Sequence, residues 1–155
     1  MDNPCPCCNV QVAADDDNVY VSWRAQFPNG EEKPAIRDMV IASSTDNGKT
    51  FSEPIKVLVS DWIPPQRIFL TIDDNDTVWV TWEDATGLST NDRSWRYGDT
   101  QAMIYTAQIY DGELIRSETP ININESKSLT AIESAQGVVS IVWTEKDNSI
   151  MYASN

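Results

Sequence analysis

The stretch Ser44-Thr45-Asp46-Asn47-Gly48-Lys49-Thr50-Phe51 has the form Ser-x-Asp-x-Gly-x-Thr-Phe and directly follows the apolar run 39–43. An Asp side chain in a turn can accept hydrogen bonds from backbone amides farther along, and Gly supplies a positive φ. A terminal Phe can pack under the turn and fasten it to the sheet. The stretch therefore predicts a hairpin turn between two strands, with structural roles for Ser44, Asp46, Gly48, Thr50 and Phe51.

Strand patterns recur along the chain in three similar units. In each unit, two short apolar runs flank a polar turn, and the second run alternates and ends in a tryptophan. These tryptophans are Trp23, Trp82 and Trp143. A third run follows each of them, and a fourth run with an early proline follows in two units, at 53–57 and 119–123. Proline suits an outer edge strand, where a missing donor costs little.

A repeat of about 60 residues built from four strands is typical of a propeller blade. No helical periodicity competes with it. We therefore predict an all-β chain, a β-propeller segment of about three blades made of antiparallel four-stranded sheets. The blades cover about 9–58, 67–124 and 127–155, and the last lacks its outer strand. The three tryptophans, at equivalent places, are predicted to be largely buried between blades.

The 44–51 turn resembles the Asp box of the bacterial sialidase superfamily, the BNR-type repeat found in β-propellers. Other segments are similar to the N-terminal part of a sialidase-like propeller, and the similarity is good over 5–85 and generic beyond. They are Cys5-x-Cys7-Cys8, the strand end Trp23-Arg24, Arg37-Asp38 and Asp61-Trp62-Ile63. The resemblance implies the fold, but Asp boxes lie on the propeller's far face and do no chemistry.

Composition limits the classes of partner. The 155 residues include 24 Asp and Glu against 11 Lys and Arg, so the net charge is −13, which argues against nucleic acid or an anionic membrane. The chain has no apolar run long enough to span a bilayer and no signal-peptide pattern. We expect a soluble protein, either cytoplasmic or exported with its signal removed. The absence of His excludes His-based catalysis and His metal ligands.

The cysteines Cys5, Cys7 and Cys8 lie close together, and an odd number cannot pair fully within one chain. Their spacing lacks the Cys-x-x-Cys of a zinc knuckle. Three interpretations stay open: small, partly buried residues at the entry to the first strand, a metal or redox role, or an intermolecular disulfide.

In a propeller, the loops after the second strands and the loops between blades share one face around the central channel. Here that face collects the segments 1–8, 24–38, 58–67, 83–102 and 144–149. It also gathers five arginines: Arg24, Arg37, Arg67, Arg93 and Arg96. Guanidinium groups bind carboxylates in bidentate fashion, so these arginines predict a clamp for a ligand carboxylate. The alternative is that they pair with neighbouring carboxylates of the chain.

Aromatic residues on the same predicted face can stack on sugar rings or pack over the propeller rim. These are Trp62, Trp95 and Tyr97. The predicted ligand-binding set is therefore Arg24, Arg37, Arg67, Arg96, Trp62 and Trp95.

Sialidase-like enzymes use an arginine cluster, a Tyr nucleophile paired with a Glu, and an Asp acid/base. The resemblance offers Asp38, Glu83, Asp84 and Tyr97 as candidate counterparts. The family's Arg-Ile-Pro motif is missing, and no residue matches the nucleophilic Tyr by motif. The resemblance therefore implies a glycan- or carboxylate-binding relative of the glycoside hydrolases without a full catalytic set and without a cofactor. The alternative is a scaffold for protein–protein interaction or assembly.

Two acidic turns, 15–18 and 73–76, are predicted to lie on the face opposite the arginines. Oxygen-rich clusters suit Ca²⁺, but these turns do not follow the twelve-residue loop pattern, so no metal site is predicted.

Three blades alone leave the apolar flanks of blades one and three turned to water, which soluble proteins tolerate poorly. Two such arcs about a two-fold axis would make a ring of six blades, the number usual for sialidase-like propellers. The interface would be isologous, with blade three of each chain against blade one of the other. We expect a homodimer, although a gene fragment would explain the missing outer strand equally simply.

Overall fold

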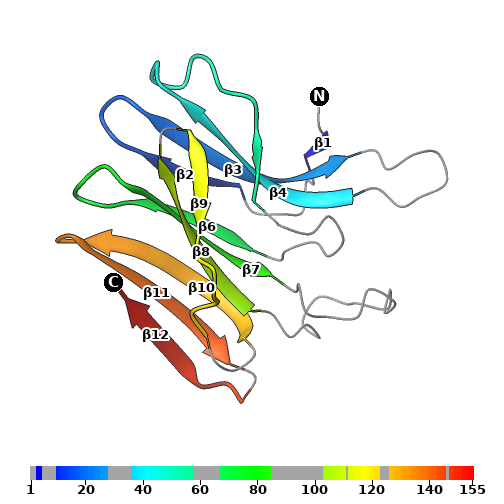
Figure 1. The fold of residues 1–155 in the computed structure, drawn as a ribbon, viewed down its shortest axis with the longest axis vertical. Helices are drawn as coiled ribbons and strands as arrows, with labels where there is room; N and C mark the ends of the chain where they lie inside the picture. Colours follow the sequence, from blue (N-terminus) through cyan, green and yellow to red (C-terminus); the bar gives the residue numbers. More distant parts are fainter. Residues whose placement is uncertain are drawn as a thin grey trace.

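The computed structural model describes residues 3–4, 10–27, 36–57, 67–84, 103–110, 112–122, 126–145 and 147–155. Every regular element in these ranges is a β-strand (Figure 1). The prediction of an all-β chain is therefore confirmed. Because the described residues form no helix, none of them belongs to a helix that could cross a membrane.

The strands form three antiparallel sheets, here called A, B and C. Sheet A contains β1 (Asn3–Pro4), β2 (Gln11–Ala14), β3 (Val19–Phe27), β4 (Ile36–Ser44) and β5 (Ile55–Lys56). Sheet B contains β6 (Ile68–Ile72), β7 (Val78–Asp84), β8 (Met103–Tyr110) and β9 (Glu113–Arg116). Sheet C contains β10 (Ser126–Ala135), β11 (Val138–Glu145) and β12 (Ile150–Ser154).

Neighbouring strands follow chain order in sheets B and C, and in sheet A from β2 to β5. Sheet B runs β6-β7-β8-β9 and sheet C runs β10-β11-β12. In sheet A, β1 and β2 both pair with β3, and β4 and β5 follow on its other side. The first long strands of the three sheets lie together, since β6 contacts both β2 and β10.

Side chains of a strand alternate between the two faces of its sheet. We call the face that carries Trp23, Trp82 or Trp143 the tryptophan face of its sheet, and the other the opposite face. Trp82 lies on β7 opposite Ile68 and Tyr105, and Trp143 lies on β11 opposite Leu129 and Met151.

Two apolar clusters stack the sheets in the order A, B, C. The first joins the opposite face of sheet A to the tryptophan face of sheet B, with Met39, Ile41, Val57, Ile68, Leu70, Val80, Trp82 and Ala107 buried. The second joins the opposite face of sheet B to the tryptophan face of sheet C, with Ile104, Leu129, Ile141 and Trp143 buried. Sheet B is thus packed on both faces, whereas sheets A and C each pack one face against it.

The burial expected for the three tryptophans is correct for two of them. Trp82 is 1% exposed and Trp143 is 4% exposed. Trp23 is less deeply buried than the other two, in the intermediate range. The reason is that the tryptophan face of sheet A points away from sheet B, while those of sheets B and C each pack on the preceding sheet.

Two strand boundaries also differ from expectation. The outer strand of sheet B is β9, which follows directly on the turn at Gly112 (φ 76°), instead of the expected 119–123. A tight turn lets pairing with β8 resume at once, so the strand starts earlier. The strands β3 and β4 extend beyond the expected runs. Arg24 and Asp38 therefore lie within the sheet, where Arg24 pairs with Met39 and Asp38 pairs with Ala25 across the two strands.

Candidate functional site

The 44–51 turn joins β4 to β5 and is closed by its own side chains. Asp46 Oδ1 accepts hydrogen bonds from the backbone N–H groups of Lys49 (2.9 Å) and Thr50 (2.8 Å) and from Ser44 Oγ (2.7 Å). Thr50 Oγ1 donates to Asp46 Oδ2 at 2.6 Å, and the Gly48 N–H donates to Ser44 Oγ at 2.9 Å. Asn47 and Gly48 both have positive φ, at 58° and 79°. The turn bonding expected from the sequence is therefore present.

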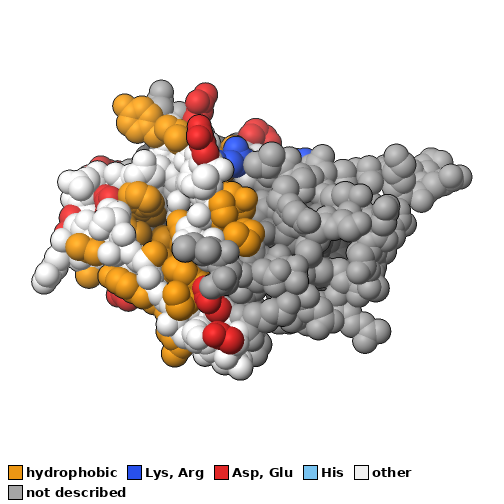
Figure 2. Space-filling model, turned by 60° about the horizontal axis from the view of Figure 1, so that its bottom comes forward, with side chains coloured by type: hydrophobic (Ala, Val, Ile, Leu, Met, Phe, Trp, Pro, Cys, Tyr) orange, Lys and Arg blue, Asp and Glu red, His pale blue; other side chains and the backbone are white. Residues whose placement is uncertain are grey.

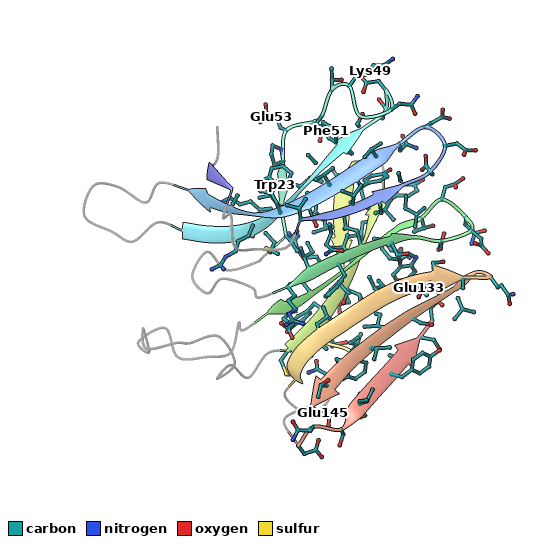
Figure 3. All side chains as sticks on the ribbon, turned by 180° about the vertical axis from the view of Figure 1, so that it is seen from behind. Trp23, Lys49, Phe51, Glu53, Glu133 and Glu145 are labelled. Carbon is teal, nitrogen blue, oxygen red and sulfur yellow. The ribbon has the colours of Figure 1, made fainter. Side chains whose placement is uncertain are left out.

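These bonds favour the ionised Asp46 carboxylate. The bonds from the Thr50 hydroxyl and N–H, and then from Ser44, lower the pKa of Asp46 to about 2. The Phe51 side chain is 47% exposed, so its predicted role as an anchor under the turn stays a prediction. Figure 3 shows Phe51 and Lys49 at the edge of sheet A. The polar bonds around Asp46 shape this turn.

Charges differ between the two ends of the sheets. The 44–51 turn and the hairpins 15–18 and 73–76 lie at one end, on the left in Figure 1. Arg24 near the end of β3 and Arg67 just before β6 lie at the other end. The hairpin end is acidic, and the separation of these turns from the two arginines agrees with the sequence-based placement.

A hollow of about 360 Å³ lies at the hairpin end, between the first hairpins of sheets A and B. It is lined by Asp15, Asp16, Asp17, Asn18 and Asp76. Asp15 Oδ1 accepts hydrogen bonds from the N–H groups of Asp17 and Asn18, and the bonds from Asn18 lower the pKa of Asp15. Within the described ranges, no group of three or more acidic or cysteine side chains has the arrangement of a metal site.

The hairpin of sheet B is held in a similar way. Asp73 Oδ1 accepts from the N–H groups of Asn75 and Thr77, and Asp73 Oδ2 accepts from Trp79 Nε1 at 2.9 Å. Burial raises the pKa of Asp73, but the bonds from Trp79, Thr77 and Asn75 outweigh it, so the net pKa is lowered. The leading carboxylate of each acidic turn is thus a structural acceptor.

Glu83 is the best-defined of the candidate acids. It lies on β7, on the face toward sheet C, and is 2% exposed. Glu83 Oε1 accepts a hydrogen bond from the backbone N–H of Leu129 in β10, and Arg67 Nη1 donates to the Leu129 carbonyl at 3.1 Å. Two charged side chains of sheet B therefore hold both backbone groups of one residue in sheet C.

The pKa of Glu83 is shifted by its burial and by its two partners. Burial raises the pKa of the Glu83 carboxyl, and the Leu129 N–H and the Arg67 charge offset that rise only in part. A carboxyl with a raised pKa beside an arginine is a feature of functional sites and of structural ion pairs alike. Its side-chain hydrogen bond to Leu129 joins sheet B to sheet C.

Of the other described candidates, Arg67 lies beside Glu83, whereas Arg24 and Asp38 do not. Arg24 is half-buried on the opposite face of sheet A, toward sheet B, while Arg67 reaches the boundary between sheets B and C. Asp38 is fully buried and pairs in register with Ala25, on the tryptophan face of sheet A. Asp38 and Glu83 therefore lie on different layers of the stack.

The remaining candidates lie outside the described part of the chain. These are Cys5, Cys7, Cys8, Trp62, Arg93, Trp95, Arg96 and Tyr97, together with the side chains of Arg37 and Asp84. Their roles stay predictions.

One contact was not anticipated from the sequence. Arg116 on β9 donates from Nε to the carbonyl of Val57 and from Nη2 to the carbonyl of Lys56, both at 2.8 Å. It joins the outer strand of sheet B to that of sheet A. A single arginine on an outer strand gives no sequence signal for such a role, because its partners are backbone atoms far away along the chain.

Comparison of the chain with protein-family models and with curated proteins found no match.

Proposed function

We propose that the three sheets are blades of a sialidase-like β-propeller and that the 44–51 turn is an Asp box. Three features support this: the strands β2 to β5, β6 to β9 and β10 to β12 each pair in chain order, the first long strands contact one another, and tryptophans occupy equivalent places on β3, β7 and β11. The hydrogen bonds that converge on Asp46 are those that the Ser-x-Asp-x-Gly-x-Thr pattern requires.

On this fold, the proposed function is binding of an anionic sugar or another small carboxylate at the end of the sheets that carries the arginines. The observation that supports it is the position of Arg24 and Arg67 at the same end of adjacent sheets, away from the acidic hairpins. Guanidinium groups in a partly buried setting bind carboxylates strongly. In a strongly acidic chain, Arg24 and Arg67 at one end would direct an anion to that end.

Binding without turnover is favoured over hydrolysis. Asp38 and Glu83 lie on different layers, and Glu83 Oε1 is engaged by the Leu129 N–H. Sialidase-like enzymes use a Tyr nucleophile with a Glu and an Asp acid/base around one sugar, so both carboxyl groups have to reach the same site. An assembly role, the alternative class, is favoured by the exposed apolar side chains of Val12 on β2 and of Ile150 and Tyr152 on β12.

A glycan array and a fluorogenic sialoside assay on the same sample test this function. We expect acidic glycans to be retained and the sialoside to be left intact. Arg24→Met keeps the apolar stem and removes the charge, so binding should weaken about tenfold or more, the scale of a lost charge-assisted hydrogen bond. Lys49→Met is the matched control, since it removes one positive charge at the other end of the sheets and should leave binding unchanged.

No retention of any acidic glycan or simple carboxylate would contradict the proposal. Equal weakening by Arg24→Met and Lys49→Met would show that only net charge matters.

A further inference from the structure

The tip of the 44–51 turn is the dipeptide Asn47-Gly48. Both residues have positive φ, at 58° and 79°. Two successive positive φ values are those of a type I′ turn, in which the first central residue has the left-handed conformation. Asn47 is exposed, and Figure 3 shows the nearby Lys49 at the edge of sheet A. The dipeptide therefore meets water while the turn holds its backbone.

The pair Asn47-Gly48 has a chemical reactivity of its own. Asn is one of the chemically labile residues of proteins, and it reacts most readily before Gly, which has no side chain to crowd its nitrogen. The Gly48 nitrogen loses its proton to hydroxide and attacks Cγ of Asn47. The bond between Cγ and Nδ2 breaks, and Nδ2 takes up a proton and leaves as ammonia. Water then opens the resulting five-membered imide, which gives Asp or isoaspartate at position 47.

The left-handed conformation of Asn47 opposes this ring closure. The ring needs the Gly48 nitrogen and the Asn47 Cβ on the same side of the bond between Cα and the carbonyl carbon of Asn47. In the left-handed conformation of an L-residue, these two atoms lie on opposite sides of that bond. The backbone must therefore rotate by nearly half a turn before the nitrogen can reach Cγ. Such a rotation takes Asn47 out of the conformation that the turn requires.

Hydrogen bonds add a second restraint on the attacking nitrogen. The Gly48 N–H donates to Ser44 Oγ at 2.9 Å, so the proton that has to be removed is held inside the turn. Ser44 is itself 2% exposed and donates to Asp46 Oδ1 at 2.7 Å, which fixes the acceptor. Asp46 also binds the N–H groups of Lys49 and Thr50, on the other side of the dipeptide. The folded turn therefore restrains both the proton and the backbone rotation.

We propose that Asn47 is a modification site at which water deamidates the chain when the 44–51 turn opens, and that Ser44 suppresses the reaction in the closed turn. The substrate is the chain's own Asn47 amide and the co-reactant is water. The rate follows local opening, because only an open turn allows the rotation at Asn47.

The modification acts back on the turn. Isoaspartate at position 47 places one extra carbon in the backbone between Asp46 and the N–H groups that it binds, so these bonds cannot all be kept. The Asp product keeps the spacing but adds a negative charge beside Asp46. The chain already has a net charge of −13, and Figure 2 shows acidic side chains at several places on the visible face. Both products therefore weaken the turn, and the loss of ammonia makes the step one-way.

The test follows Asn47 in the full chain by peptide mass spectrometry, at physiological temperature and mildly alkaline pH. Each conversion raises the mass of the peptide by about one dalton. The folded chain should react at least about tenfold more slowly than the chain unfolded in denaturant, since tenfold needs an opening free energy of only about 1.4 kcal/mol. The chain's other Asn-Gly pair, Asn29-Gly30, lies outside the described residues and calibrates the unfolded rate, which should be the same at both pairs.

Serine variants test the role of Ser44. Ser44→Ala removes the acceptor of the Gly48 N–H and should speed the folded reaction about fivefold, the ratio for one hydrogen bond of ordinary net strength. Ser52→Ala is the matched control, because Ser52 Oγ accepts from the Ser43 N–H at 3.1 Å just outside the turn. It should leave the rate unchanged. Asn47→Gln should abolish the mass gain at this peptide, because the longer side chain would have to close a larger ring.

Thr50→Val replaces Ser44→Ala if circular dichroism shows that the latter does not fold. It removes the bond of 2.6 Å from Thr50 Oγ1 to Asp46 Oδ2 and should also speed the reaction. The proposal is overturned if Asn47 reacts equally fast in the folded and unfolded chains, or in neither. It is also overturned if the folded variant reacts no faster than the wild type, or if Ser52→Ala speeds the reaction as much as Ser44→Ala.

Discussion

The tryptophan faces of sheets A and B have the same pattern of residues but differ in burial along their first long strands and at their tryptophans. In sheet B, Ile68, Val80 and Trp82 are at most 1% exposed. In sheet A, the equivalent Val10 is 59% exposed and Trp23 is half-buried. Alternation along the strands decides which face is apolar, but a neighbouring sheet decides whether that face is removed from water.

Truncation of the equivalent tryptophan should therefore lower the free energy of unfolding by different amounts in the two sheets. Trp82 stacks on Tyr105 with ring centroids 6.0 Å apart and lies in the cluster between sheets A and B. We expect Trp82→Ala to lower the free energy of unfolding by about 3–5 kcal/mol, as for other large aromatic truncations in cores. Trp23→Ala should cost less than half of that in dilute protein. Chemical denaturation gives both numbers, and equal losses would mean that both faces are covered.

Glu83 tests the other covered boundary, between sheets B and C. Glu83→Ala leaves the buried Leu129 N–H without its acceptor, so we expect a loss of about 1–3 kcal/mol. Glu83→Gln keeps an acceptor oxygen and removes the titration. Because burial raises the folded pKa of Glu83, the wild type should lose stability relative to Glu83→Gln as the pH rises from the unfolded value of 4.5. Thermal unfolding from pH 4 to pH 8 would show this, and parallel curves would rule out a raised pKa.

Arg116 tests how much the outer strands add to the contact between sheets A and B. Arg116→Ala removes two hydrogen bonds from an exposed side chain, to the carbonyls of Lys56 in β5 and of Val57 just after it, so we expect a loss of about 1 kcal/mol. Arg116→Lys should recover only part of it, since Lys lacks the planar fork. Full recovery by Lys would show that charge, and not geometry, matters there.

Substitution of Asp46 should change the stability of the stacked sheets least at neutral pH, because its hydrogen bonds all stay within the 44–51 turn. Its folded pKa of about 2 lies below the ordinary value of 3.8, so the carboxylate stabilises the fold above pH 4 and this contribution disappears as the pH falls toward 2. Asp46→Asn should reduce the acid sensitivity of the melting temperature. Amide hydrogen exchange at Lys49 and Thr50 measures the turn itself, and unchanged protection in the variant would contradict the role of these bonds.

Much of the fold follows from local rules. Alternating runs predict the strands, and the Asp and Gly of the 44–51 turn fix its hydrogen bonds within eight residues. The candidate site was less predictable. The prediction that Arg24 and Asp38 lie in a loop was wrong, because strand pairing extends β3 and β4 beyond their apolar runs. The contacts of Glu83 and Arg67 could not be predicted, because their partner is the backbone of Leu129 in another sheet.

The sequence by itself determined the strands, the turns and the apolar face of each sheet, because these depend on residues within a few positions of one another. Only the tertiary structure decided that Trp82 is buried while Trp23 is half-exposed, and that Glu83 is an inter-sheet contact with a raised pKa. Burial and electrostatics depend on which surfaces meet, and residues that meet in this chain lie about sixty positions apart, beyond the reach of any local pattern.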